Sequence, residues 1–493
     1  MATLNLAAID LGAESGRVVR AAFDGRTLQL EEVHRFPNVP VRVLNSLHWD
    51  PLRLFAEITH GLALCARAGP LSGIGLDTWG VDFALLGRDD ELLGNPFHHR
   101  DRRTDGMMER AFQRVPREEI FERTGIQFMS LNTLYQLLAM AEARAPALEA
   151  AQTFLTMPDL LNFWLSGRKV CEFTNATTTQ MYDQRTKSWA QAMLSRLGLP
   201  AHIFPEVIPP GTVLGPLLPS VAEELGGEPV PVIAPACHDT GSAVAAVPAQ
   251  ARHSAYISSG TWSLVGVEAE APVITPQSLA YNFTNEGGVA GTVRLLKNVM
   301  GLWLLQECRR TWAHEGHDYS YAQLTHKAES AAPFRSLVDP DHVEFLPPGD
   351  MPARLHDFCL HTGQPAPESQ AAFARCIFES LALKYRWVIE KLEALLGHRL
   401  EVIHVIGGGS QNALLCQLTA DATGRPVIAG PVEATALGNA LVQVMALGHL
   451  SSLAEARQVV RDSFAPVMYA PRASAAWDEA YMRWTHLLPE PLR

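Results

Sequence analysis

The pattern of hydrophobic and polar residues predicts the same local structure at two places in this chain, each at the start of a domain. Residues 4–23, LNLAAIDLGAESGRVVRAAF, predict an apolar strand, a turn from Gly12 to Gly16, and a second strand. Residues 252–270, RHSAYISSGTWSLVGVEAE, predict the same order, with the turn from Ser258 to Thr261. The two openings lie about half a chain apart, a period far too long for a solenoid. They therefore predict two related domains.

Strands and helices alternate through the rest of the chain. Helices are expected near residues 52–67, 132–143, 293–310, 373–397, 412–424 and 434–448, and strands within residues 72–86, 401–411 and 425–431. Residues 172–183, EFTNATTTQMYD, are expected to form a threonine-rich loop or sheet edge. Strands that alternate with helices imply parallel or mixed sheets with covered faces, so the predicted fold class is α/β.

Composition narrows the possible functions. A chain of 493 residues favours two domains over one core, and no apolar run reaches the ~18 residues of a membrane span. The N-terminus has no basic segment before its apolar residues, so it predicts a strand and not a signal peptide. A net charge of −12 without a basic stripe argues against nucleic acid as a partner. Seven scattered cysteines without a C-x-x-C pair favour a reducing cytoplasm.

Two titratable residues interrupt an otherwise apolar stretch at residues 233–248, IAPACHDTGSAVAAVP. His238 and Asp239 fall between a predicted strand and a predicted helix of small residues. The simpler interpretation is that Asp239 is the helix N-cap, with its carboxylate accepting N–H groups of the first turn. The other is that Asp239 is a functional carboxylate at the rim of a sheet, where α/β proteins bind substrates. The two interpretations are compatible.

The first predicted turn, within IDLGAESGR, has the chemistry of an anion site. Gly12 and Gly16 would permit positive φ angles and a close approach of backbone N–H groups to a phosphate. Asp10, at the end of the strand, suits Mg²⁺ held through water, because that ion keeps much of its hydration shell. The alternative is a plain β-turn beside a solvated Arg17. Glu14 adds a negative charge to this turn and is expected to point to solvent.

Two later segments could complete a nucleotide site. In ISSGTWS, Thr261 could offer a hydroxyl and an N–H to a phosphate, although a purely structural turn explains the sequence equally well. In VIGGGSQN, three glycines follow a predicted strand, and they would let a flat group such as adenosine lie against bare backbone. The spacing fits neither a Rossmann fingerprint nor a P-loop. Each segment is a weak signal by itself, and their order is more informative.

That order resembles the actin-like ATPase fold, and from Leu6 to Leu447 the chain resembles the FGGY carbohydrate kinases. The resemblance implies two actin-like (ribonuclease H-like) domains with a catalytic cleft between them. Residues 1–248 would form an N-terminal domain with the sugar site, the first phosphate hairpin and the catalytic base. Residues 249–450 would form a C-terminal domain with the second phosphate hairpin and the adenosine site, and residues 451–493 a helical tail.

Within this family, four sequence motifs are similar to those of the kinases of L-rhamnulose: DTWGVDF, TNATTTQ, HDTGSAV and GPVEATALGN. The resemblance implies transfer of the γ-phosphate of Mg²⁺-bound ATP to the C1 hydroxyl of L-rhamnulose, in L-rhamnose catabolism, with Asp239 as the general base. The residues implied to bind the sugar are Gly80, His238, Asp239, Thr240 and Asn298. The residues implied to contact ATP are Ala13, Glu14, Ser15, Gly16, Arg17, Thr261, Gln306 and Gly408, and Asp10 would serve the metal ion.

Two alternatives remain at this level. The first is a kinase of another deoxy-ketose, such as L-fuculose, because pocket geometry and not sequence distinguishes these sugars. The second is a non-catalytic, nucleotide-gated sugar sensor or an assembly ATPase of the same fold. A sensor should lack the base, and Asp239 is present. In each case the expected partners are small molecules, with no nucleic acid and no membrane.

Overall fold

The computed structural model describes residues 3–251 and 253–489. The described residues do not include Arg252, the first residue of the second predicted strand–turn–strand segment. They also do not include residues 1–2 of the first predicted domain or residues 490–493 of the predicted tail. The chain forms two compact units. Unit 1 comprises the residues up to Pro248 together with Glu268–Leu295 and Ala434–Ser463. Unit 2 comprises Ala249–Val267, Leu296–Glu433 and the residues from Phe464 onward. The units are therefore discontinuous in sequence.

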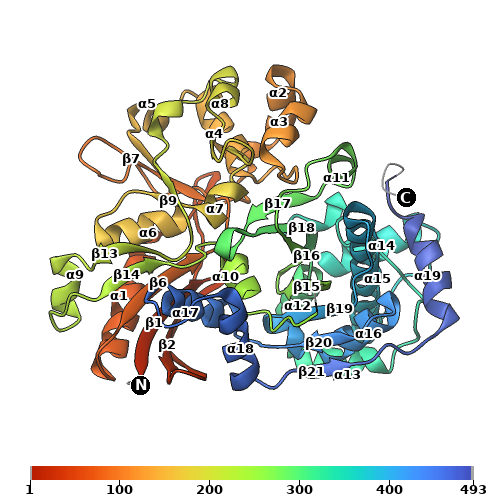
Figure 1. The fold of residues 1–493 in the computed structure, drawn as a ribbon. Helices are drawn as coiled ribbons and strands as arrows, with labels where there is room; N and C mark the ends of the chain where they lie inside the picture. The colour runs from red at the N-terminus through yellow and green to blue at the C-terminus, as the bar shows by residue number, and fades with distance from the viewer. Residues whose placement is uncertain (1–2, 252, 490–493) are drawn as a thin grey trace. The chain divides into compact units, whose positions relative to one another are not determined.

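Unit 1 is built on a mixed six-stranded sheet (Figure 1). Its strands are, in spatial order, β13 (Thr212–Pro216), β14 (Pro231–Ala234), β6 (Gly73–Thr78), β1 (Leu4–Leu11), β2 (Ser15–Phe23) and β3 (Leu28–Pro37). Strand β6 pairs in parallel with both β1 and β14, whereas β1, β2 and β3 form antiparallel pairs. The first predicted opening is thus the β1–β2 hairpin.

Helices cover both faces of this sheet because β1 is apolar on both sides. Ile9 and its same-face neighbours pack with residues of α1 (Pro51–Arg67) and α6 (Met157–Ser166). On the opposite face, Ala8 packs with Ala436 of α17 (Ala434–Ala446). Helix α10 (Asp239–Ala245) packs against α17 and β6. A strand buried on both faces has a continuous apolar run, which is the pattern of residues 6–9 ahead of Asp10.

The remaining elements of unit 1 lie around this layered core. The helices are α2 (Met107–Arg114), α3 (Arg117–Thr124), α4 (Thr133–Glu142), α5 (Pro146–Ala150), α7 (Phe173–Thr178), α8 (Gln191–Leu197), α9 (Pro219–Glu224), α11 (Pro276–Ala280) and α18 (Leu453–Ser463). The strands include β7 (Phe83–Leu86), paired with β8 (Thr153–Thr156), and β17 (Thr284–Gly287). The predicted loop or edge at residues 172–183 is wrong for α7. That helix begins because the Glu172 carboxylate accepts from the N–H groups of Thr174 and Asn175.

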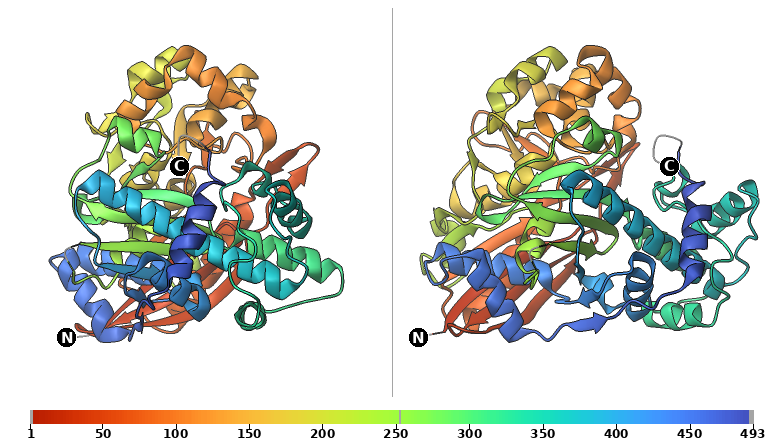
Figure 2. Two further views of the ribbon diagram at one scale, coloured as in Figure 1. Left: turned by 90° about the vertical axis from the view of Figure 1, so that its right-hand side faces the viewer. Right: turned by 45° about the vertical axis from the view of Figure 1, so that its right-hand side comes forward.

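Unit 2 has its own mixed sheet. Its strands are, in spatial order, β18 (Val293–Met300, whose first three residues belong to unit 1), β16 (Trp262–Ala269, whose last two residues belong to unit 1), β15 (Ser254–Ser259), β19 (Val402–Ile406), β20 (Val427–Ala429) and β21 (Val467–Tyr469). Its helices are α12 (Trp303–His314), α13 (Tyr321–Glu329), α14 (Met351–His361), α15 (Gln370–Leu396), α16 (Ala413–Thr423) and α19 (Ala475–Thr485). The long helix α15 runs beside α16 in both further views (Figure 2).

One predicted helix of unit 2 is only half correct. Residues 303–310 belong to α12, but residues 293–300 form strand β18. Seven of the eight residues of β18 are buried, so both of its faces are covered. A short apolar run of that kind fits a helix and a buried strand equally well.

Two further findings bear on the expectations from composition. The seven cysteines are buried free thiols. Within residues 3–251 and 253–489, no helix has both the length and the apolar character needed to cross a bilayer.

Candidate active site

Asp239 is the first residue of helix α10, and four residues separate it from the end of β14. The N-cap residue is His238, in extended conformation (φ −82°, ψ 118°), so the prediction of Asp239 as N-cap is wrong by one position. Asp239 nevertheless serves the first turn, because its Oδ1 accepts from Thr240 N (2.5 Å) and Thr240 Oγ1 (3.1 Å). The Asp239 side chain keeps 29% of its exposure, whereas His238 and Thr240 are buried. The carboxylate is thus held in place and still reachable.

Three carboxyl groups of unit 1 influence one another at this end of the sheet. Burial raises the pKa of Asp239; the neighbouring His238 opposes that shift and the Asp10 charge adds to it. Asp77, the residue beside Asp10 in the parallel register of β6 and β1, is fully buried. Burial, followed by the charge of Asp10 and then that of Asp239, raises the pKa of Asp77 well above its ordinary value. Asp77 is not among the residues predicted from the sequence, although its place at the end of an apolar strand was an available signal.

Asp10 and Asp77 have the chemistry of a site that holds Mg²⁺ through water molecules. Asp10 Oδ2 accepts from Arg17 Nη2 (2.7 Å) and Nε (3.0 Å) across the β1–β2 hairpin. Asp77 Oδ2 accepts from Asn439 Nδ2 (2.6 Å), while its buried Oδ1 has no hydrogen-bond partner. Among the described residues, no three His, Cys, Asp or Glu side chains are arranged to enclose an ion directly. One or two protein carboxylates with water and phosphate oxygens match the usual coordination of Mg²⁺.

The first predicted phosphate hairpin forms, but its glycines serve another purpose than expected. Gly12 and Gly16 do not have positive φ angles, so that part of the prediction is wrong. A Cβ on Gly16 would lie 2.4 Å from Phe36 Cε2, so glycine is required there for packing. The turn closes through Gly12 N to Ser15 O (2.9 Å), and Glu14 is exposed, as expected.

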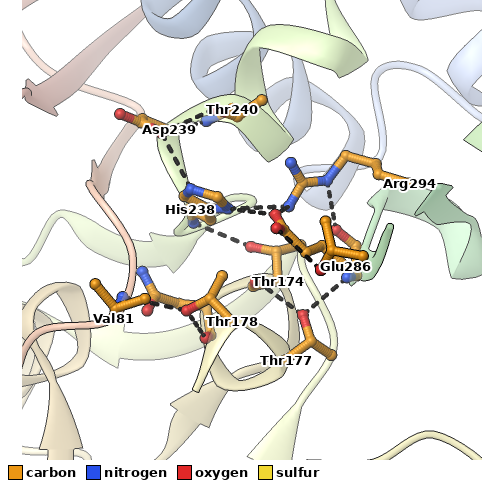
Figure 3. Close-up of polar contacts among 12 residues, drawn as sticks. Val81, Thr174, Thr177, Thr178, His238, Asp239, Thr240, Glu286 and Arg294 are labelled. Carbon is orange, nitrogen blue, oxygen red and sulfur yellow. Dashed lines mark hydrogen bonds and ion pairs between the residues drawn. The ribbon is translucent and has the colours of Figure 1, made fainter. Parts of the chain in front are cut away.

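His238 joins Asp239 to two charged residues that sequence analysis missed (Figure 3). Its Nε2 lies 3.4 Å from Asp239 Oδ1, and its Nδ1 lies 3.0 Å from Arg294 Nη2. Glu286 Oε2 lies 3.3 Å from the same Nδ1 and 3.2 Å from Arg294 Nη2. Arg294 is fully buried and also donates from Nε to Gly287 O (2.7 Å). Residues so distant in sequence from His238 carry no local signal that they meet it.

The turn that carries Gly80 is strained. Val81, the next residue, has a φ of 68°, a rare conformation for a β-branched residue. Its N–H donates to Thr178 Oγ1 (3.2 Å), and its carbonyl accepts from Thr133 Oγ1 (2.6 Å) and Gln136 Nε2 (3.2 Å). These three hydrogen bonds hold the backbone of the turn from both sides.

Asp82, the residue after Val81, anchors the same turn through its carboxylate. This fully buried carboxylate accepts at Oδ2 from the indoles of Trp49 (2.6 Å) and Trp79 (2.9 Å), lies 2.8 Å from His99 Nδ1, and accepts at Oδ1 from Gln136 Nε2 (3.1 Å). Its oxygens are therefore occupied by protein groups, so its role is structural.

Three of the residues predicted to contact the nucleotide, Thr261, Gln306 and Gly408, lie in unit 2. Thr261 lies in the β15–β16 turn, and its carbonyl accepts from the N–H of Trp303 (3.1 Å) at the start of α12. Gln306, on that helix, has a buried Oε1 without a hydrogen-bond partner. The glycine run follows β19, and a Cβ on Gly407 would lie 3.1 Å from Ser259 O, at the end of β15. Asn298, predicted to bind the sugar, also belongs to unit 2, on β18.

Comparison with known proteins identifies the family. Residues 6–246 match the N-terminal domain, and residues 255–447 the C-terminal domain, of the FGGY family of carbohydrate kinases. The chain belongs to the FGGY family of carbohydrate kinases. Similar FGGY kinases include the rhamnulokinases of Bacteroides thetaiotaomicron (48% identity, 97% of this chain and 98% of the relative) and Oceanobacillus iheyensis (46%, 94% and 97%). The predicted family resemblance is confirmed.

Two solved xylulose kinases share the fold at low sequence identity. A ligand-bound xylulose kinase from Lactobacillus acidophilus matches with a TM-score of 0.78 at 18% identity, over 98% of this chain and 96% of that one. The xylulose kinase from Rhodospirillum rubrum matches with a TM-score of 0.79 at 18% identity, over 98% of each chain. The predicted α/β fold of the family is confirmed, while the cleft expected between its domains and the functional boundaries assigned to them stay predictions.

Proposed function

We propose that this chain transfers the γ-phosphate of ATP to the C1 hydroxyl of L-rhamnulose, which gives L-rhamnulose 1-phosphate and ADP in the breakdown of L-rhamnose. The observation that carries this proposal is the 42–48% identity to rhamnulokinases over almost the whole chain. The geometry around Asp239 adds a reactive carboxylate to that similarity. Seven free cysteines suit a reducing compartment, so we place the reaction in the cytoplasm.

In this proposal Asp239 is the general base. The C1 hydroxyl gives its proton to the Asp239 carboxylate as the hydroxyl oxygen attacks the γ-phosphorus, and ADP leaves with the electrons of the broken P–O bond. Burial and the nearby Asp10 charge raise the pKa of Asp239, which strengthens it as a proton acceptor. The hydrogen bonds from Thr240 fix the orientation of its Oδ1. Positioning of this kind is the main protein contribution to phosphoryl transfer.

The sugar would lie between the Gly80 turn and the start of α10. We assign His238 and Thr240 to its hydroxyls beside Asp239, and Asn298 as a further contact. The rigid backbone at Gly80 would offer polar groups without conformational cost, because hydrogen bonds on both sides of Val81 already hold it.

We assign the nucleotide contacts to the β1–β2 turn of unit 1 and to Thr261, Gln306 and Gly408 of unit 2. The backbone N–H groups of residues 13–16 and the Arg17 guanidinium supply donors for phosphate oxygens. Thr261 and Gly408 would border the nucleotide in unit 2. Gln306 suits a hydroxyl or amino donor of the nucleotide, because its buried Oε1 has no protein partner.

Asp10 is the residue that would hold Mg²⁺, through water, with Asp77 behind it. The orphaned Oδ1 of Asp77 and the clustered negative charge fit a hard cation. When bound, the ion supplies neutralisation of the phosphate charge. The pairing of Asp10 with Arg17 holds the carboxylate in place for that task.

A panel of acceptors tests this function. We expect ADP release with Mg·ATP to be fastest, in kcat/KM, for L-rhamnulose when L-rhamnulose, L-fuculose, L-xylulose, D-xylulose and glycerol are compared. Preference for L-fuculose or another ketose would contradict the assigned substrate and keep the kinase. A chain that binds sugar and nucleotide but releases no ADP with any acceptor would be a sensor and not an enzyme.

A further inference from the structure

Helix α7 carries three buried hydroxyls that each accept a hydrogen bond from a different segment of unit 1 (Figure 3). Thr174 Oγ1 accepts from His238 N (3.0 Å), and Thr177 Oγ1 accepts from Gly287 N (2.8 Å). Thr178 Oγ1 accepts from Val81 N (3.2 Å). One short helix thus contacts three segments that lie far apart in the sequence.

The three segments are the ones that form the sugar side of the site. The N–H bound by Thr174 precedes Asp239 by one residue. The N–H bound by Thr177 follows Glu286, whose carboxylate contacts both His238 and Arg294. The N–H bound by Thr178 belongs to Val81, next to Gly80. None of these contacts reaches a reacting atom, so the threonines act through the segments that they hold.

The direction of each hydrogen bond is fixed. Thr174 Oγ1 donates its proton to Glu172 Oε2 (2.5 Å), Thr177 Oγ1 to Thr174 O (3.1 Å), and Thr178 Oγ1 to Asn175 O (2.8 Å). Thr177 and Thr178 thus donate to carbonyls of α7 and Thr174 donates to Glu172, the N-cap residue, so each hydroxyl directs a lone pair at the neighbouring N–H. Serine can reproduce this arrangement, whereas valine, although it matches threonine in shape, cannot.

Thr178 has an additional role at the strained turn. A Cβ on Gly80 would lie 3.1 Å from Thr178 Oγ1, so the hydroxyl fits closely against the turn. The positive φ of Val81 persists only because neighbouring groups constrain it. Without the Thr178 hydroxyl, the N–H of Val81 would lose its acceptor and the turn one of the constraints that hold it.

We propose that Thr174, Thr177 and Thr178 are positioning residues that set the geometry of the sugar site from one common helix. Thr174 fixes the turn of Asp239, Thr177 fixes the strand that presents Glu286 to His238, and Thr178 fixes the turn at Gly80. This inference rests on the proposed function for its kinetic readout. It has a second readout in the exchange of three named backbone N–H groups, which does not depend on turnover.

Thr179 provides a matched control at the end of the same helix. It is as deeply buried as Thr174, but its hydroxyl donates to Ala176 O (2.6 Å) and accepts from Met181 N (3.2 Å). Those bonds stay within three residues of Thr179 and reach none of the three segments. Thr179→Val removes a buried hydroxyl at similar structural cost without releasing a site segment.

The first measurement is hydrogen exchange by mass spectrometry on single threonine-to-valine variants. We expect faster exchange at the peptide with His238 in Thr174→Val, with Gly287 in Thr177→Val, and with Val81 in Thr178→Val, and at none of them in Thr179→Val. Unchanged exchange at the matched peptide, or faster exchange at all three peptides in every variant, would overturn the proposal. Where a valine variant does not fold, alanine removes the same hydroxyl with less bulk, and the same expectations hold.

The second measurement is steady-state kinetics on the same variants and on their serine counterparts. We expect Thr178→Val to raise KM for the sugar about tenfold at similar kcat, and Thr174→Val to lower kcat about tenfold at similar KM for ATP. Serine at either position should restore values within about twofold, because it keeps the hydroxyl. Losses in Thr179→Val equal to those in Thr174→Val would show a merely structural role. Absence of wild-type turnover with any sugar would overturn the proposed function alone, since the exchange pattern tests the positioning separately.

Discussion

Asp159 is a buried carboxyl group of unit 1 that is not among the candidate site residues. Asp159 lies in α6 and accepts from Thr156 Oγ1 and from Glu172 N (3.0 Å). Burial nevertheless raises its pKa to about 7 from an ordinary 3.8. Asp239, by contrast, keeps part of its surface exposed. Burial raises the pKa of both carboxyl groups, but only Asp239 keeps exposed surface, so only there would the raised pKa serve the proposed base.

Asp159 makes stability depend on pH with a definite sign. Between about pH 4 and 7 the folded state holds a proton that the unfolded state has released, so the unfolding free energy falls by up to about 1.4 kcal/mol per pH unit as pH rises. Asp159→Asn keeps an acceptor for Glu172 N and cannot titrate. We expect the thermal unfolding temperature of the wild type to decrease, relative to that of Asp159→Asn, as the pH is raised from about 5 to about 7.5. Parallel pH curves for the two proteins would contradict this reasoning.

Gly408 allows a clean test of the adenosine assignment. A Cβ there meets nothing within 4 Å, so a larger side chain fits the unliganded fold. Gly408→Leu would occupy the space assigned to the nucleotide, and we expect KM for ATP to rise about tenfold while KM for the sugar stays within about twofold. Steady-state kinetics in both substrates measure this difference.

Gly407 is the matched control in the same run of glycines. It has a φ of 79°, and its Cβ would lie 3.1 Å from Ser259 O. Gly407→Ala should therefore lower the unfolding temperature, whereas Gly408→Leu should leave it unchanged. A rise in KM for the sugar and not for ATP in Gly408→Leu would place the adenosine site elsewhere.

At the scale of elements, the crossing of α10 and α17 supports the start of α10. A Cβ on Gly438 of α17 would lie 1.7 Å from Ser242 O of α10, three residues after Asp239. Gly438→Ala must push the helices apart, and overpacking of this kind costs about 1–3 kcal/mol. Because α10 carries Asp239 at its first position, we expect kcat to fall at least about tenfold, together with the unfolding temperature. Ala446→Ser, near the end of α17, is the control. Wild-type kcat and stability in Gly438→Ala would refute the tight crossing.

The elements also show what sequence pattern can and cannot predict. Strands β1, β2, β15 and β19 and helix α15 were predictable because their apolar runs end at clear turn residues. The segments at residues 173–178 and 293–300 were not. In the first, threonines with modest helix propensity form a helix because Glu172 caps it and unit 1 buries it. In the second, burial of both faces removes the periodicity.

The candidate site divides in the same way. Asp10, His238 and Asp239 could be selected because each is polar at the end of an apolar run. Arg294, Glu286 and the threonines of α7 could not, since their role comes from contacts with segments far away in the sequence. Tertiary contacts of this kind have no local signature.

At the scale of the whole molecule, the order of segments along the chain was more informative than any one of them. Two hairpins, an Asp-Thr-Gly turn and a glycine run suggested the family, which the matches over residues 6–246 and 255–447 confirm. The discontinuity of the two units in sequence was not predictable. Residues Ala434–Ser463 follow the second hairpin in sequence and yet belong to unit 1. There Asn439 of α17 bonds Asp77, a contact that requires the folded chain.

The most direct test of the central claim, that Asp239 is the base of an ATP-dependent L-rhamnulose kinase, compares wild type, Asp239→Asn and the exposed control Asp89→Asn. Phosphorus NMR would identify the product made from L-rhamnulose and Mg·ATP, and calorimetry would measure the binding of each substrate. We expect L-rhamnulose 1-phosphate from wild type and Asp89→Asn, and turnover lowered about 10²–10⁴-fold in Asp239→Asn with binding nearly unchanged. Most of the turnover surviving in Asp239→Asn would contradict the account.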